Sequence, residues 1–498
     1  MGESGARGER RACTVTDLRP ADPEGAIEPD PARWRILAVT LVIGFMALLD
    51  VTIVNVALPS IREGLGASSA GVQWIVSGYA LTFGLTLVAG GRLGDTHGRR
   101  RMMLIGLTGF IASSAAVGLS PNEGTVIAAR LLQGVAAGLL TPQNSGLIQQ
   151  LFSGPERGRA FGLFGLTVSV SAATGPILGG LIIAALGEDY GWRAIFLVNV
   201  PIGLVALVFV ARLVPGPPAP EDGGGAQLDL PGAVLLGAGV LCVLLPVVAV
   251  MDGPSPVLVL LLGAPLMLVA FNRWERRVVA RGSAPLLDVA LLGQAPGYAS
   301  GIAVGTLYFT GFTGVFLVLS VHLQEALGLS PLATGLLLTP FAVGSAVTAT
   351  SAGRGVSRIG RKVTVLGLVV VLVGLAAVAV AVPGRDGTEL WPLLVLPLLV
   401  AGLGGGAVVS PNFTLTLADV PPRMGGAAGG ALQTGQRIGS ALGAALMMAA
   451  YQVTISQTGD TAAGLRAALG TALLMIVAAL VLAVRDLRLD AGRELAPR

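Results

Sequence analysis

The chain has 498 residues, of which 53% are apolar and only 12% are charged, and its formal net charge at pH 7 is +4. A mean hydropathy of +0.79 excludes an ordinary water-soluble enzyme or binding domain, because such proteins carry about twice this share of charged residues. The two cysteines, Cys13 in a polar segment and Cys242 in an apolar run, give no basis for a disulfide framework or a cysteine metal site.

The amino-terminal segment, residues 1–34, contains arginines, acidic residues and prolines but no apolar core. A cleavable signal peptide needs such a core, so we expect a disordered cytoplasmic tail instead.

Long apolar stretches occupy most of the remaining sequence. A bilayer core of about 30 Å is crossed by about 20 helical residues, and backbone amides in lipid must be bonded within their own helix. We therefore predict an all-α polytopic membrane protein with fourteen transmembrane helices; the shortness of the eighth leaves twelve or thirteen open. The predicted spans are 36–58, 73–91, 102–119, 124–148, 160–186, 193–214, 230–250, 256–271, 298–321, 332–352, 363–382, 391–412, 425–451 and 463–484.

The basic residues cluster after even-numbered spans, as in 99–101, Arg276-Arg277 and Arg361-Lys362. Because positive residues mark the cytoplasmic side of a membrane protein, we expect these connections and both termini to be cytoplasmic. Arginine greatly outnumbers lysine, and Ala and Gly are abundant, which is typical of a high-GC bacterial genome. The expected location is therefore the bacterial cytoplasmic (inner) membrane.

One loop pattern occurs twice. Gly91-Arg92 followed by Gly98-Arg99-Arg100 reappears, at a constant offset of 262 residues, as Gly353-Arg354 followed by Gly360-Arg361-Lys362. Two related, like-oriented six-helix halves indicate a transporter that opens a central site to one side and then the other. The predicted organisation is a first bundle at 35–214, a linker at 215–229, two inserted helices at 230–275, a linker at 276–297, a second bundle at 298–485 and a cytoplasmic tail at 486–498.

Several motifs carry a family resemblance over nearly the whole chain. They are the loop from Gly91 to Arg101 with Asp95 inside it, Arg130 to Gly134 in the fourth span, and Gly175-Pro176 with Gly179-Gly180 in the fifth. Together they resemble the major facilitator superfamily, and within it the fourteen-helix drug:proton antiporters. The resemblance implies the major facilitator fold, export of a small molecule by a monomer that uses the proton gradient, and no cofactor or metal. Ser357 stands where the second loop copy would repeat Asp95, so the acidic role is expected of Asp95 only.

Proton coupling needs a group that can bind and release a proton inside the membrane. Asp50 lies deep in the first span, where an ionised side chain without a partner costs several kcal/mol. At 1.5 Å per residue, Asp50 lies roughly 14 Å below Pro59 and Arg130 roughly 10 Å below Glu123, so the two are about one turn apart in depth. We predict that they pair and that Asp50 is the proton site. A purely structural ion pair is the alternative.

The loop motif, with Gly91, Arg92, Asp95, Gly98, Arg99 and Arg100, is predicted to act as a hinge and lock. Its glycines allow a tight turn, and Asp95 can bond arginines or a neighbouring helix end when the cytoplasmic side is closed. Basic residues that only fix orientation are the alternative, but these leave Asp95 unexplained. Gly175, Pro176, Gly179 and Gly180 are predicted to form a close helix contact or a pivot in the fifth span.

A substrate cavity is predicted from polar and aromatic residues at membrane depth. Tyr308, Phe312 and Phe316 recur every four residues and line either a cavity or the core. Arg437 has no acid at matching depth in its own half, so it receives an anionic group of the substrate or is satisfied by carbonyls. His97 and His322 are predicted to lie in loops. The remaining candidates, each able instead to bond between helices, are Asn55, Asn144, Gln433 and Gln436.

The leading hypothesis is thus a proton-coupled antiporter that exports drugs, antibiotics or other small amphiphilic molecules. An importer or facilitator on the same scaffold is the alternative, which Asp50 and the glycine-proline motif disfavour. The sequence has no GxxxxGK[ST] phosphate loop and no HExxH motif, so an ATP-driven pump or a metallohydrolase lacks the residues it needs. The expected partners are the substrate, protons and the lipid bilayer, with no nucleic acid.

Overall fold

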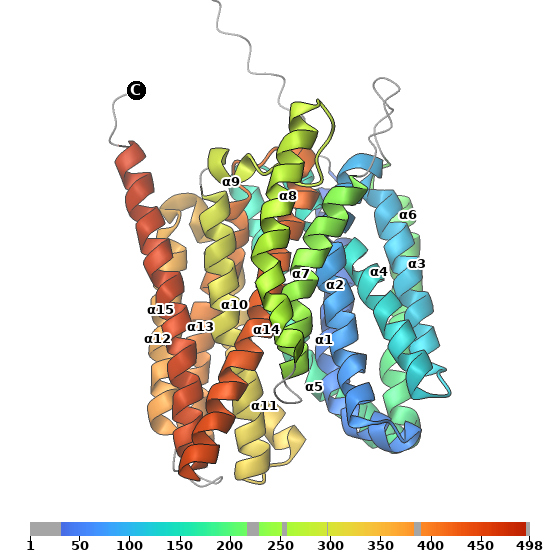
Figure 1. Cartoon of the computed structure of the whole chain (residues 1–498), viewed down its shortest axis with the longest axis vertical. Coiled ribbons are helices and arrows are strands. Elements are labelled where there is room, and N and C mark those ends of the chain that lie inside the picture. Colours follow the sequence, from blue (N-terminus) through green and yellow to red (C-terminus); the bar gives the residue numbers. More distant parts are fainter. Residues whose placement is uncertain (1–30, 217–228, 251–255, 296, 383–389, 495–498) are drawn as a thin grey trace, which may run out of the picture.

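The structure is a computed structural model that describes residues 31–216, 229–250, 256–295, 297–382 and 390–494 (Figure 1). This part of the chain is helical and has no strand. Its α-helices are α1 (Arg33–Leu65), α2 (Ser69–His97), α3 (Arg99–Gly118), α4 (Glu123–Leu151), α5 (Gly154–Leu197), α6 (Asn199–Leu213), α7 (Leu230–Val250), α8 (Gly263–Ala280), α9 (Leu291–Gln294), α10 (Tyr298–Val321), α11 (Pro331–Ile359), α12 (Lys362–Ala381), α13 (Leu390–Thr416), α14 (Gly425–Thr458) and α15 (Thr461–Glu494). Shorter turns are η2 (Pro256–Leu262), η3 (His322–Ala326) and η4 (Pro422–Met424).

Twelve described segments are long and apolar enough to cross a membrane, which confirms a multi-pass membrane protein. One of them, Gly154–Leu213, is 60 residues long and contains a non-helical residue, Gly187, with φ 77°. Another apolar helix, Leu230–Pro246, is shorter than a full span by this measure. The count of fourteen therefore stays a prediction.

Several boundaries differ from those expected. The inserted pair was expected to end at residue 275, but α8 continues to Ala280 because Phe271, Glu275 and Val278 form one buried face of an amphipathic helix end. The linker 276–297 also contains α9. The second bundle was expected to end at residue 485, yet α15 runs to Glu494, and Asp486 bonds to Arg361. Residues 1–30, 217–228 and 495–498 of the predicted tails and linker lie outside the described residues.

Two helical bundles stand side by side, with α1–α6 in one and α10–α15 in the other (Figure 1). Each has its own apolar core: Ile43, Phe83 and Phe110 belong to the first, and Leu319, Leu375 and Leu469 to the second. The inserted helices α7 and α8 cover the junction of the bundles, where α7 packs between α2 and α14 and α8 buries Phe271 beside Val88 and Ala427.

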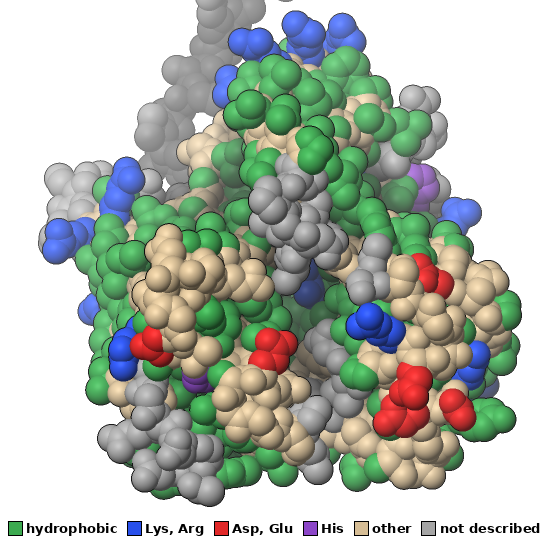
Figure 2. Space-filling model, turned by 60° about the horizontal axis from the view of Figure 1, so that its bottom comes forward, with side chains coloured by type: hydrophobic (Ala, Val, Ile, Leu, Met, Phe, Trp, Pro, Cys, Tyr) green, Lys and Arg blue, Asp and Glu red, His purple; other side chains and the backbone are tan. Residues whose placement is uncertain are grey.

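The bundles are joined at the end that carries the Arg99–Arg101 loop, which we name the basic end. A shared apolar cluster there combines Phe152 and Phe161 of the first bundle with Tyr298 and Phe413 of the second. At the opposite end, Figure 2 shows a hollow between the bundles, with basic side-chain atoms visible in its depth. The structure is thus closed at the basic end and open at the other.

Candidate functional site

The deepest polar site lies inside the first bundle, around Asp50 of α1. Asp50 and Arg130 are both 0% exposed, and Arg130 Nη1 lies 2.5 Å from Asp50 Oδ2. The two residues meet where α1 contacts α4, with Asp50 near the middle of α1 and Arg130 about two turns from the start of α4, in agreement with the depth estimate from the sequence. The predicted pair is therefore present in the structure, whereas its role in proton transfer stays a prediction.

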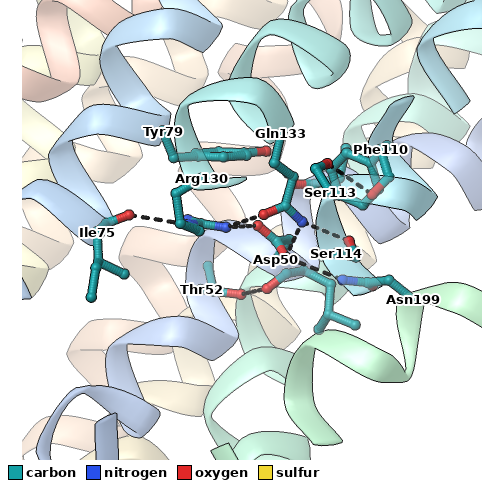
Figure 3. A network of polar contacts seen from close by, with 12 residues as sticks. Asp50, Thr52, Ile75, Tyr79, Phe110, Ser113, Ser114, Arg130, Gln133 and Asn199 are labelled. Carbon is teal, nitrogen blue, oxygen red and sulfur yellow. Dashed lines mark hydrogen bonds and ion pairs between the residues drawn. The ribbon is translucent and has the colours of Figure 1, made fainter. Parts of the chain in front are cut away.

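Two further side chains, Gln133 and Asn199, bond to this pair, and Ser114 bonds to Gln133 (Figure 3). Gln133 Nε2 and Asn199 Nδ2 donate to Asp50 Oδ1 at 3.0 and 3.1 Å. Gln133 also accepts from Arg130 at 2.8 Å and donates to Ser114 Oγ at 2.7 Å. Charge-assisted bonds of this kind compensate the desolvation of a buried carboxylate, so the site is stable as long as each donor stays in place.

Aromatic rings separate this network from the middle of the molecule. The guanidinium carbon of Arg130 lies 4.1 Å from the centroid of the Tyr79 ring, and Tyr79 packs against Phe83 with 5.7 Å between centroids. On the far side of this aromatic pair, Arg437 of α14 lies over the Phe83 ring at 4.5 Å. Two arginines from opposite bundles thus flank one aromatic pair.

The second site is a lock at the basic end. Asp95, whose side chain is 0% exposed, accepts from Gly426 N at 3.1 Å and from Ala427 N at 2.8 Å, two backbone amides in the first turn of α14. Its Oδ1 lies 2.7 Å from Arg99 Nη2, and Arg99 also donates to Pro422 O in the second bundle. A carboxylate at a helix amino terminus is favoured by the helix dipole, so Asp95 ties the two bundles together.

Glycines allow the close approach that this lock requires. A Cβ on Gly91 would lie 2.2 Å from Gly426 O, which no side chain can tolerate. The second loop copy makes the equivalent contact between α11 and α5, where a Cβ on Gly353 would lie 2.4 Å from Gly158 O. Ser357, at the position equivalent to Asp95, is exposed and bonds only to its own helix at Arg354 O. The two crossings therefore share geometry, but only one is locked by a charge.

The remaining loop residues also have defined places. Gly98 adopts φ 92°, in the region that favours glycine, and begins the turn into α3. Arg100 donates to Ala211 O of α6. Arg92 is partly buried near the lock.

The glycine-proline motif of α5 faces α1. A Cβ on Gly175 would lie 2.1 Å from Thr52 Oγ1, which places the two helices in close contact two residues from Asp50. Gly179 is buried, whereas nothing lies within 4 Å of a Cβ on Gly180. The backbone of Pro176 is helical, and its side chain lies outside the described residues.

The predicted cavity residues are dispersed. Tyr308 is 2% exposed and belongs to the core of the second bundle, where it stacks on Phe312, while Phe312 and Phe316 are partly buried against Phe341. Gln436 is buried near Gly305. Asn144 Nδ2 and Oδ1 and Gln433 Nε2 are buried and have no partner among the described residues. The side chain of Asn55 lies outside the described residues.

Sequence reasoning missed several residues of these sites. Gln133 lies three residues after Arg130, on the same helix face, and that spacing was an available signal. Nothing in the sequence linked Asn199 or Tyr79 to Asp50. The loop assignment of His322 is wrong: it is 2% exposed in η3, and its Nδ1 lies 3.2 Å from the Tyr451 hydroxyl. Glu275 of α8 was also missed; it is fully buried, and a Cβ on Gly232 would lie 2.7 Å from its Oε1.

Comparison with known proteins covers both bundles. A sequence model described as the Major Facilitator Superfamily matches residues 40–444 and 301–495. The probable actinorhodin transporter of Streptomyces coelicolor is 38% identical over 88% of this chain and 77% of its own length. The puromycin resistance protein of Streptomyces alboniger is 37% identical over 89% of this chain and 86% of its own. Among solved structures, the human organic anion transporter MFSD10 has a similar fold, with a TM-score of 0.67 at 18% identity over 91% of this chain and all of that one.

Proposed function

The chain belongs to the major facilitator superfamily and is a transporter rather than an enzyme; from this premise we propose that it exports antibiotics or similar amphiphilic small molecules in exchange for protons. The relatives named for antibiotic transport and resistance support the choice of substrate class. We further propose that the basic end faces the cytoplasm of a bacterium, as the positive-inside rule requires.

The observation that carries the proton-coupling proposal is the coordination of Asp50. A carboxylate that is 0% exposed and held by Arg130, Gln133 and Asn199 is the kind of intramembrane acid that transporters use as a proton site. Protonation removes its charge and thereby weakens the bond between α1 and α4. Arg130 then keeps Ile75 O, Gln133 and the Tyr79 ring as partners, so its buried positive charge is still compensated.

The transport cycle alternates between two closures. In the state described here, Asp95 closes the basic end and the hollow opens to the outside, where substrate leaves and a proton enters. Protonation of Asp50 loosens the first bundle next to the α1–α5 contact at Gly175, and the bundles rock toward the cytoplasm-facing state. Loss of the proton to the cytoplasm, together with substrate binding, resets the cycle.

Resistance and flux measurements test this proposal. Expression in an efflux-deficient bacterium should raise the inhibitory concentration of puromycin or another antibiotic in a panel, and Asp50→Asn should abolish the increase at equal membrane abundance. Inverted vesicles energised with an inward-acid pH gradient should accumulate the same compound. Accumulation without any dependence on the gradient, or movement only in the opposite direction, would show that the chain is a facilitator or importer.

A further inference from the structure

Among the described residues, Arg437 is a mid-membrane arginine without an acidic or hydrogen-bonding partner. Among the described residues, Arg130 and Arg437 are the two basic side chains near the middle of spanning helices. Arg130 is 0% exposed and paired with Asp50. Arg437 is partly exposed, and within the described part of the chain it forms neither an ion pair nor a hydrogen bond.

The positive charge of Arg437 carries a desolvation cost that no ion pair or hydrogen bond among the described residues offsets. An arginine at the centre of a membrane helix is unfavourable unless it is hydrated or paired, and such residues mark binding sites or ion paths. Arg437 lies twelve residues from the start of α14, or about 18 Å along the helix axis, close to the middle of the membrane. The position gives no structural reason for a cation.

The surroundings of Arg437 suit an anionic ligand. The guanidinium carbon of Arg437 lies 4.5 Å from the centroid of the Phe83 ring, and Phe83 packs against Tyr79; both rings are 1% exposed, so the charge lies against an apolar wall of the first bundle that offers it no anion. Neighbouring positions of α14 carry buried polar atoms without a partner, Gln433 Nε2 and Thr434 Oγ1. An acidic partner is absent from this neighbourhood among the described residues, since Asp50 lies behind Tyr79 and is already engaged by three donors.

We propose that Arg437 binds an anionic group of the substrate, and hence that the exported compounds carry an acidic group such as a carboxylate or a phenolate. The inference rests on the proposed export function and narrows its substrate class. A guanidinium binds a carboxylate through paired hydrogen bonds, and Gln433 Nε2 on the same helix is a further donor without a partner among the described residues. An inside-negative membrane potential also drives an anion outward, in the direction of export.

Direct binding to the full chain in lipid nanodiscs tests the proposal. The probes are three fluorescent compounds with the same ring system: anthracene-9-carboxylate, anthracene-9-carboxamide and anthracen-9-ylmethylammonium. Fluorescence anisotropy should show that the carboxylate binds at least about tenfold more tightly than the amide, and the ammonium most weakly. Arg437→Gln should reduce carboxylate affinity to that of the amide and leave amide binding unchanged, whereas Arg437→Lys should retain part of the preference.

Arg466→Gln is the matched control, because Arg466 is an exposed arginine at the outer start of α15, and it should change none of the three affinities. Equal affinity for carboxylate and amide in the unaltered chain, or a preference that survives Arg437→Gln, would overturn the proposal. Export of a neutral or cationic drug alongside such a result would leave the proposed function intact, whereas absence of any export would refute the function itself.

Discussion

Replacing Asp95 with asparagine should open the basic end of the molecule. The carboxylate accepts two backbone hydrogen bonds at the amino terminus of α14 and pairs with Arg99, all within a buried site. The asparagine oxygen can accept one of these bonds, but its NH2 group would face a second donor and cannot accept from it. Asparagine also has no negative charge to interact with the helix dipole or with Arg99.

The magnitude follows from these contacts. One lost hydrogen bond to a charged group contributes about 1.5–3 kcal/mol, and the lost interaction with the helix dipole adds up to about 2 kcal/mol. A total of about 3 kcal/mol shifts the ratio of closed to open molecules by about 150-fold. A lock that is almost fully closed in the native protein should therefore become a mixture of closed and open forms.

Distances between spin labels measure this mixture. The spin labels are attached to cysteines that replace His97 at the end of α2 and Ile359 at the end of α11, after Cys13 and Cys242 have been changed to serine. Both labelled positions are exposed, and they lie on opposite bundles. Asp95→Asn should add a population at longer distance, while Ser357→Ala, the equivalent position of the second copy, should leave the distribution unchanged. If Asp95→Asn gives the native distribution, or Ser357→Ala opens the molecule to the same degree, the lock has been assigned wrongly.

Two further substitutions test the packing on which the account depends. A Cβ on Gly158 would lie 2.3 Å from Gly353 O, so Gly158→Leu should prevent closure at the α5–α11 crossing. The variant should insert into the membrane but should not export. Export equal to that of the native chain would contradict this prediction. Gln133→Leu removes the amide that donates to Asp50 and to Ser114, so it should lower the free energy of unfolding in detergent by about 1–3 kcal/mol. The control Gln457→Leu, on the exposed end of α14, should leave the free energy of unfolding unchanged. Equal stability of the two variants would count against the network around Asp50.

The buried ion pair could be predicted from the sequence because helix geometry fixes depth. Counting 1.5 Å per residue from the two helix ends brought Asp50 and Arg130 to similar levels, and an unpaired charge in lipid is costly enough to make a pair the expected arrangement. Gln133 and Asn199 could not be assigned in the same way. Amide side chains occur at many helix contacts, and their burial creates no charge that requires a particular partner.

For the lock at the basic end, the sequence predicted the kind of contact that Asp95 makes but not its partner helix. The sequence indicated that Asp95 would bond arginines or a helix end, and the glycines around it required a close approach of backbones. Which helix it reaches depends on the packing of two bundles, since Gly426 is 331 residues away along the chain. His322 was misplaced because its segment, His322–Ala326, follows an apolar span and is polar in composition, yet it stays helical and packs against Tyr451.

Proton flux measured on the purified chain tests the central claim most directly. The chain is reconstituted into liposomes that contain a pH-sensitive dye and carry a pH gradient, and the compound selected by the resistance screen is then added. We expect substrate to collapse the gradient in the native chain but not in Asp50→Asn, although the variant still binds the compound. A gradient that Asp50→Asn dissipates upon substrate addition as fast as the native chain would contradict a proton site at Asp50.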